Sequence, residues 1–259
     1  MTDRQRSVKA PALVGAQAHD SPSQDGADCH GQSAAAASPL DCVRVPLWKR
    51  VLDISCALVA IPSLLPMMLV IAFLIKANSK GPVIFKQERV GLLGKRFILY
   101  KFRTMVAGAD TSAHEKHVDT LMKTNGPMTK LDVGGDARLI PLGRIIRAAG
   151  LDELPQLVNV LRGEMSLVGP RPCLPNEYKC YLPQQRERFR TLPGLTGLWQ
   201  VSGKNRTTFN EMIDCDIQYV RMQSLWLDLR ILLKTIPALM VEVKDIQSPS
   251  TSTTPSHSN

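Results

Sequence analysis

The chain has 259 residues, of which 44% are hydrophobic, so it is too apolar for a disordered protein and long enough for one good-sized core or two small ones. Its formal net charge of +9 and its pI of about 9.4 indicate anionic partners, which are nucleic acid, phospholipid head groups or phosphorylated substrates. The six cysteines form no CxxC pair and no metal-ligand spacing with the five histidines, which disfavours a disulfide-dense secreted scaffold and favours a reduced, cytosol-facing protein.

Both ends of the chain are polar and lack apolar periodicity. We expect residues 1–46 to form a disordered arm and residues 247–259 a disordered tail, because their Ala-, Ser- and Thr-rich compositions cannot build a core. The arm holds four basic and five acidic residues and the tail none, so the remaining 28 basic and 18 acidic residues lie in residues 47–246. The positive excess therefore belongs to the middle of the chain.

An uncharged run of 22 residues extends from Ile54 to Ile75. As one straight helix it would reach roughly 33 Å, which is enough to cross the hydrocarbon core of a membrane. Pro62 and Pro66 interrupt it, and each removes a backbone donor, so a bend is expected. The residues flanking the run are basic on both sides, namely Arg44, Lys49 and Arg50 before it and Lys76, Lys80, Lys86 and Arg89 after it.

Basic flanks favour the cytoplasmic side, and here they draw both ends of the segment to that side. We therefore predict a re-entrant helix over residues 47–80, broken at Pro62, that enters and leaves the membrane by one face. A kinked spanning helix is the alternative.

The segments after the membrane helix predict a small hairpin followed by short helices. Residues 82–90 and 95–102 are typical of strands joined by a turn at Gly91–Gly94, and residues 106–135 are typical of a mobile loop or a short helix. Residues 139–167 contain two short helical patterns. The second has Leu154, Leu157, Val158 and Leu161 at helical spacing, with Gly163 as its end.

A last helical region is predicted over residues 209–243. Its segment 225–240 is apolar on one side and carries Arg230 and Lys234 on the other, as in a helix that lies in a membrane surface. A helix packed in the protein core fits the same pattern equally well.

The most informative motif is LDELPQ at residues 151–156, where two carboxylates stand at a predicted helix start. Helix capping explains Asp152 by itself, because Asp is a favoured N-cap and acids suit the positive end of the helix dipole. The same dipole also attracts a phosphate and keeps Asp152 ionised, so that Asp152 can attack phosphorus or hold a divalent cation. Spacing alone leaves both explanations open.

Basic residues near this motif favour phosphate chemistry. Arg147 lies five residues before Asp152, and Lys101 and Arg103 stand at the end of the second predicted strand. Arg171 stands between two prolines in GPRP, so its guanidinium is presented with little conformational freedom to lose. Such a rigid fork suits bidentate contact with phosphate oxygens.

These segments closely resemble the bacterial sugar transferases, the monotopic polyprenyl-phosphate phosphoglycosyl transferases. The resemblance covers about 190 residues in order, from Lys49 to about Met240, and rests on KRVLD, GPVIFKQERVGLLGKRF, YKFRTM, LGRIIR, LDELPQLVNVLRGEMSLVGPRP, PGLTGLWQVSGK and LWLDLRILLKT. Gly150 replaces the family's usual small hydroxyl residue, and DARL at 136–139 lacks its customary proline. We expect both departures to alter local geometry rather than chemistry, in a minimal form of the family.

The resemblance implies transfer of a sugar 1-phosphate from a UDP-sugar to polyprenyl phosphate with release of UMP. It implies Asp152 as the nucleophile that forms a covalent phosphosugar intermediate, assisted by Glu153, with Mg²⁺ bound beside Asp152. Lys101, Arg103, Arg147 and Arg171 would then bind substrate phosphates. This reaction would be the first membrane step in making an exopolysaccharide, capsule or O-antigen type glycan.

Together these expectations describe an α+β, mainly helical monotopic membrane protein with a re-entrant helix, a small β-hairpin and amphipathic interfacial helices. We expect a catalytic domain over residues 81–246 that faces the cytosol at the bacterial inner membrane, with membrane lipids and downstream glycosyltransferases as further partners. A non-catalytic membrane-surface scaffold for polysaccharide assembly is the alternative. Nucleic acid is not an expected partner, because aromatic residues make up only 5% of the chain and the membrane segment is long.

Overall fold

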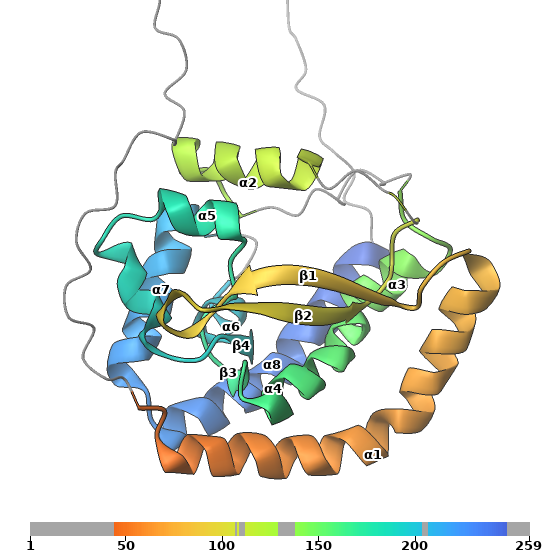
Figure 1. Cartoon of the computed structure of the whole chain (residues 1–259), viewed down its shortest axis with the longest axis horizontal. Helices are drawn as coiled ribbons and strands as arrows, with labels where there is room; N and C mark the ends of the chain where they lie inside the picture. Colours follow the sequence, from red (N-terminus) through yellow and green to blue (C-terminus); the bar gives the residue numbers. More distant parts are fainter. Residues whose placement is uncertain (1–43, 107, 109–111, 129–137, 204–206, 248–259) are drawn as a thin grey trace, which may run out of the picture. The chain divides into compact units, whose positions relative to one another are not determined.

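The computed structural model describes five parts of the chain, residues 44–106, 108, 112–128, 138–203 and 207–247 (Figure 1). The chain divides into two units, residues 1–35 and 36–259, and all described residues belong to the second unit. The predicted disordered arm and tail lie almost entirely outside the described residues, as do the first two residues of DARL.

The apolar run forms one helix, α1, from Leu47 to Asn78, which is long and apolar enough to cross a membrane by length and composition. The chain stays helical through Pro62 and Pro66, and the ribbon bends partway along its length (Figure 1). The predicted bend is therefore confirmed, although the break expected at Pro62 is a bend within a continuous helix. Each proline lacks the N–H that would bond one turn back, which permits a bend without ending the helix.

The predicted hairpin is confirmed. Strands β1 (Ile84–Val90) and β2 (Arg96–Phe102) pair antiparallel, with Phe85 opposite Lys101, and the single turn η1 (Leu92–Gly94) joins them. This register fixes Lys101 one residue before the end of β2.

A second pair of strands was not predicted. Strands β3 (Ser166–Val168) and β4 (Gly194–Thr196) pair parallel within the region rich in Pro and Gly. Their neighbourhood requires glycine, because a Cβ added at Gly194 would lie 2.1 Å from the backbone nitrogen of Gly169.

Helices account for most of the remaining described structure. They are α2 (Ser112–Thr124), α3 (Gly143–Ala148), η3 (Leu151–Gln156), α4 (Leu157–Arg162), α5 (Pro175–Cys180), η4 (Gln185–Arg190), α6 (Leu198–Val201), α7 (Phe209–Met222) and α8 (Leu225–Gln247). The short-helix alternative for residues 106–135 is confirmed by α2. The single helical region predicted over 209–243 is two helices, because the chain leaves helical geometry at Gln223.

The start of α1 is anchored by a buried polar network. The ammonium of Lys49 donates to the carbonyl of Val168 at 2.8 Å, to the hydroxyl of Tyr219 at 2.9 Å and to Asp228 at 2.6 Å. Nearby, Asp53 accepts from the hydroxyl of Ser166 at 2.8 Å. Lys49 and Asp53, which precede the uncharged run in the sequence, therefore attach α1 to β3 and α8.

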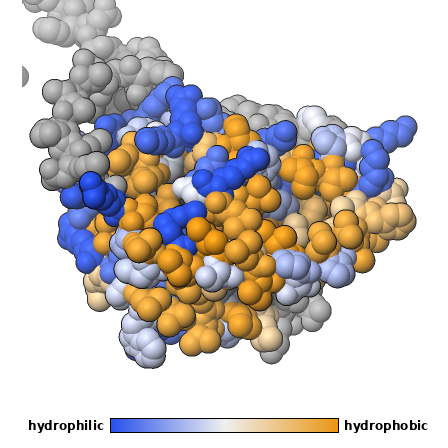
Figure 2. All heavy atoms as spheres, turned by 60° about the horizontal axis from the view of Figure 1, so that its bottom comes forward, coloured by the Kyte–Doolittle hydropathy of each residue, from blue (hydrophilic) through white to orange (hydrophobic). Residues whose placement is uncertain are grey.

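The outward side of α1, α3 and α8 is apolar. Figure 2 shows hydrophobic residues over much of the face to which α1 contributes, with hydrophilic residues between and around them. Exposed large side chains on these helices include Leu58, Leu69 and Phe73 of α1, Ile145 of α3, and Trp226, Leu233 and Met240 of α8. The α+β, mainly helical fold class is confirmed, and α8 combines both alternatives, since Asp228 and Ile231 are buried while Trp226 and Leu233 are exposed.

Candidate active site

The two carboxylates of LDELPQ lie in the first turn of η3. Gly150 occupies the N-cap with a left-handed φ of 67°, and no side chain caps this turn. Helix capping therefore does not explain Asp152, which stands inside the turn rather than before it. A Cβ at Gly150 would lie 3.2 Å from Leu239 of α8, so the departure from the family pattern falls where η3 approaches the apolar face.

Asp152 is buried among opposite charges. Asp152 is only 9% exposed, and this burial raises the pKa of its carboxyl to about 6. Lys101 and Arg147 pull this pKa down and Glu153 pushes it up, so all three side chains act on Asp152 through space. The structure thus brings together four of the predicted site residues.

Strand β2 holds Lys101 against η3. The ammonium of Lys101 lies 3.4 Å from a carboxylate oxygen of Glu153. Asn159 of α4 is fully buried and holds the strand in position. Its side-chain amide donates to the carbonyl of Ile98 at 2.7 Å, and its side-chain oxygen accepts from the N–H of Tyr100 at 3.2 Å. The helix that follows the two carboxylates therefore holds β2 in place beside them.

Arg103 has a different environment from the one its motif suggests. Its guanidinium donates to the carbonyl of Lys80 at 2.6 Å and to that of Ser79 at 3.1 Å. These carbonyls follow the last residue of α1, so Arg103 attaches the hairpin to the end of the membrane helix. Sequence reasoning assigned it only to phosphate.

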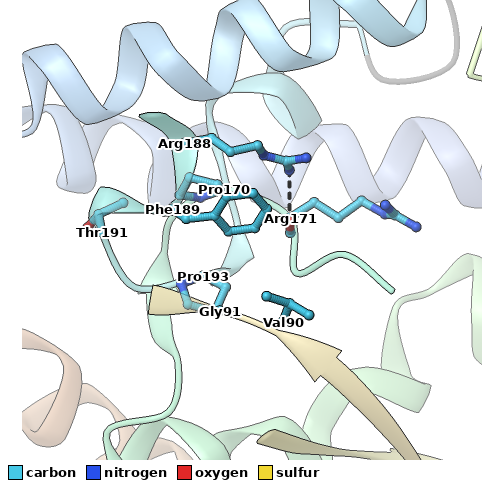
Figure 3. Close-up of a pocket in the computed structure, with 8 residues that line it drawn as sticks. All are labelled: Val90, Gly91, Pro170, Arg171, Arg188, Phe189, Thr191 and Pro193. Atoms are coloured by element: carbon cyan, nitrogen blue, oxygen red, sulfur yellow. Dashed lines mark hydrogen bonds between the residues drawn. The ribbon is translucent and has the colours of Figure 1, made fainter. Parts of the chain in front are cut away.

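Arg171 belongs to a second cluster of buried charges. It donates to Glu177 at 3.1 Å, and its own carbonyl accepts from Arg188 at 2.8 Å (Figure 3). Arg188 also pairs with Asp216. Although burial opposes it, Arg171 and Arg89 hold the pKa of Glu177 below its usual value. The cluster borders a narrow crevice lined by Val90, Gly91, Pro170, Arg171, Arg188, Phe189, Thr191 and Pro193 (Figure 3).

Arg89 links the two groups of charges. Burial, together with the positive charge of Arg171, lowers the pKa of its guanidinium to about 10, although Glu177 and Glu153 act in the opposite direction. Arg89 therefore acts on a carboxylate of each group. Sequence reasoning counted it as a flanking cation of the membrane segment, although it stands inside the quoted motif GPVIFKQERVGLLGKRF.

The donor set near Asp152 fits a magnesium ion shared with a substrate. No group of three or more His, Cys, Asp or Glu side chains converges anywhere among the described residues. Asp152 and Glu153 supply two adjacent carboxylates, and Mg²⁺ is commonly held by one or two carboxylates together with phosphate oxygens and water. An ion held by the protein alone does not fit this arrangement.

The sequence is similar to several known proteins. Residues 44–242 match the family described as bacterial sugar transferase. The chain is 42% identical over 210 residues to the UDP-glucose:undecaprenyl-phosphate glucose-1-phosphate transferase of Caulobacter vibrioides, an alignment that covers 78% of this chain and 73% of that protein. It is 38% identical to the exopolysaccharide production protein ExoY of Sinorhizobium fredii, covering 74% of this chain and 84% of the relative. Identity to the undecaprenyl-phosphate galactose phosphotransferase of Salmonella typhimurium is 37%, covering 74% and 40% respectively.

Proposed function

Because the chain belongs to the bacterial sugar transferase family, we propose that it is the enzyme that transfers a sugar 1-phosphate from a UDP-sugar to a polyprenyl phosphate, releasing UMP. The names of three relatives support this proposal, since one contains UDP-glucose and undecaprenyl phosphate, another undecaprenyl phosphate and galactose, and the third exopolysaccharide production. The product would begin a membrane-bound glycan of the exopolysaccharide, capsule or O-antigen type.

The observation that carries the proposal is a buried carboxylate held among cations beside an apolar face. In the first step, a carboxylate oxygen of Asp152 bonds to the phosphorus that carries the sugar, and the bond from that phosphorus to UMP breaks. In the second step, a phosphate oxygen of the lipid attacks the same phosphorus and releases the Asp152 carboxylate. Glu153, adjacent to Asp152, deprotonates or orients the lipid phosphate.

The cations near Asp152 stabilise the charge that moves between these steps. Lys101 and Arg147 act directly on Asp152, and Arg171 and Arg89 form the next group of positive charge. Asp152 would hold Mg²⁺ together with phosphate oxygens of the substrate, and the ion would neutralise the negative charge of the UDP-sugar diphosphate as UMP leaves. A further role for Arg103 at a phosphate would require it to leave the carbonyls at the end of α1.

The apolar face would place this site at a lipid surface. Ile145, exposed on α3, lies two residues before Arg147, and Gly150 abuts Leu239 of α8. We propose that this face rests in the cytosolic leaflet of the bacterial inner membrane, with α1 re-entrant, so that a water-soluble and a lipid-bound substrate meet at Asp152. Downstream glycosyltransferases would then receive the product.

The test is an incubation of the purified chain with radiolabelled UDP-sugar, polyprenyl phosphate and magnesium, scored for labelled lipid and for UMP. Wild-type protein should form both. Asp152→Asn should form neither, and Glu153→Gln should form no labelled lipid and release UMP in no more than a stoichiometric amount, while both variants remain attached to membranes. When polyprenyl phosphate is omitted, mass spectrometry should find a phosphosugar on the peptide that contains Asp152. Transfer by Asp152→Asn would exclude Asp152 as the nucleophile, and no transfer by the wild type with a panel of UDP-sugars would favour the scaffold alternative.

A further inference from the structure

We propose that α8 binds the head groups of anionic phospholipids through Arg230 and Lys234, which makes acidic lipid a specific partner of this protein. The inference rests on the membrane association contained in the proposed function. It adds the charge class of the lipid and the residues that recognise it.

The two basic residues share a helix face with an exposed tryptophan. Trp226, Arg230 and Lys234 are spaced four residues apart, so they form a row along one face of α8. Trp226 is 74% exposed, and both basic side chains are exposed as well. Asp228, on the opposite side of α8, is buried in the protein. The row therefore lies on the side of α8 that the domain leaves uncovered.

On the parts of α1, α3 and α8 whose side chains the structure describes, the exposed charge has one sign. On α1, α3 and α8 as far as Val241, the only acidic residues are Asp53 and Asp228, which are 1% and 0% exposed. The exposed charged residues on the same stretches are all basic, namely Lys76, Arg144, Arg230 and Lys234. A surface that combines exposed Leu, Ile and Trp side chains with cations alone is complementary to a leaflet that contains acidic lipid.

The chemistry of these side chains suits the head-group region. Long basic side chains lay their methylene stems along apolar surface while their charges stay in water, and tryptophan prefers the same interfacial depth. Each cation near an anionic membrane surface strengthens binding about fivefold. Two cations on one helix face would give a preference of roughly tenfold or more for acidic lipid at α8.

The experiment uses the exposed tryptophan as the reporter. The full chain is reconstituted into vesicles that contain equal amounts of phosphatidylglycerol and phosphatidylcholine, with brominated chains on one lipid or the other, and tryptophan quenching is compared. A Trp226→Phe variant identifies the part of the signal that belongs to α8. We expect brominated phosphatidylglycerol to quench Trp226 more strongly, and salt to reduce the difference.

Two double variants each remove two positive charges, one pair from α8 and the other from α5 and η4. Arg230→Gln with Lys234→Gln should abolish the preference for phosphatidylglycerol, whereas Lys179→Gln with Arg190→Gln, exposed on α5 and η4, should retain it. Equal quenching of the wild type by both lipids, no quenching by either, or a preference that survives in the α8 variant would each overturn the proposal. Sugar-phosphate transfer in detergent should be equal in all of these proteins, so a failure of the lipid preference is distinguished from a failure of the proposed activity.

Discussion

At the scale of single residues, the protonation state of Asp152 determines when the site can act. A nucleophilic carboxylate must be ionised, and the pKa of this one is about 6 because the group is buried. We therefore predict that kcat/KM, which reports the free enzyme, falls as the pH drops through about 6 and is level above it. The measurement is UMP release over a range of pH. A level profile down to the usual pKa of an aspartate would contradict the assigned environment.

Lys101 tests the cause of that pKa. Its positive charge favours the ionised form of Asp152, so Lys101→Met should raise the pKa and move the acidic limb of the profile to higher pH. Lys95→Met removes the same charge from an exposed position near the hairpin turn and should leave the limb in place. An unmoved limb in Lys101→Met, with only a lower plateau, would assign Lys101 to substrate binding alone.

The sequence allowed several residue roles to be predicted and concealed others. Asp152, Glu153, Lys101 and Arg147 were predicted to form one site, because they stand in short motifs at element ends. Lys49 and Arg89 looked like flanking charges of a membrane segment, and that topological explanation hid a buried anchor and a link between two charge clusters. Burial of this kind depends on contacts with residues far away in the chain, which a local pattern does not contain.

At the scale of elements, one buried amide aligns β2 with η3 and α4. Asn159 donates to Ile98 and to Glu164, and Asn159→Asp would remove those donors and place a second carboxylate beside Glu164. Leaving buried partners unsatisfied costs about 1–3 kcal/mol each, so we predict destabilisation of roughly 2–4 kcal/mol, together with loss of transfer activity. Thermal unfolding in detergent and the transfer assay measure the two effects.

The same substitution at an exposed asparagine shows whether the loss of stability comes from the buried position of Asn159. Asn210→Asp makes the same change at an exposed residue in the first turn of α7 and should alter stability little, since an acid is tolerated at a helix start. Equal stability of the two variants would show that Asn159 does not hold the strand.

Element prediction succeeded where the pattern was local and failed where the pairing was distant. The hairpin and the end of α4 at Gly163 follow from neighbouring residues, and both were predicted. Strands β3 and β4 have three residues each and meet across more than two dozen residues of chain. Their pairing depends on the close approach of glycine backbones, and such short strands carry no periodicity to detect.

At the scale of the whole molecule, the attachments at the two ends of α1 bear on its arrangement in the membrane. Its start is anchored to β3 and α8 by Lys49, and its end is held by Arg103, so both ends attach to the same described domain. A helix tied to one domain at both ends must bend to enter a bilayer and return. This attachment supports the re-entrant arrangement independently of the flanking charges.

We therefore predict that tags at the N- and C-termini are both accessible to protease from the cytosolic side only. Replacing Pro62 and Pro66 by alanine restores two backbone N–H groups, which favours a straight helix and should shift part of the population to a spanning arrangement with one terminus protected. Pro237→Ala, inside α8, is the matched control and should leave both termini accessible. A protected terminus in the wild type would establish the spanning alternative, and the buried bonds of Lys49 or Arg103 would then have to be broken in the membrane.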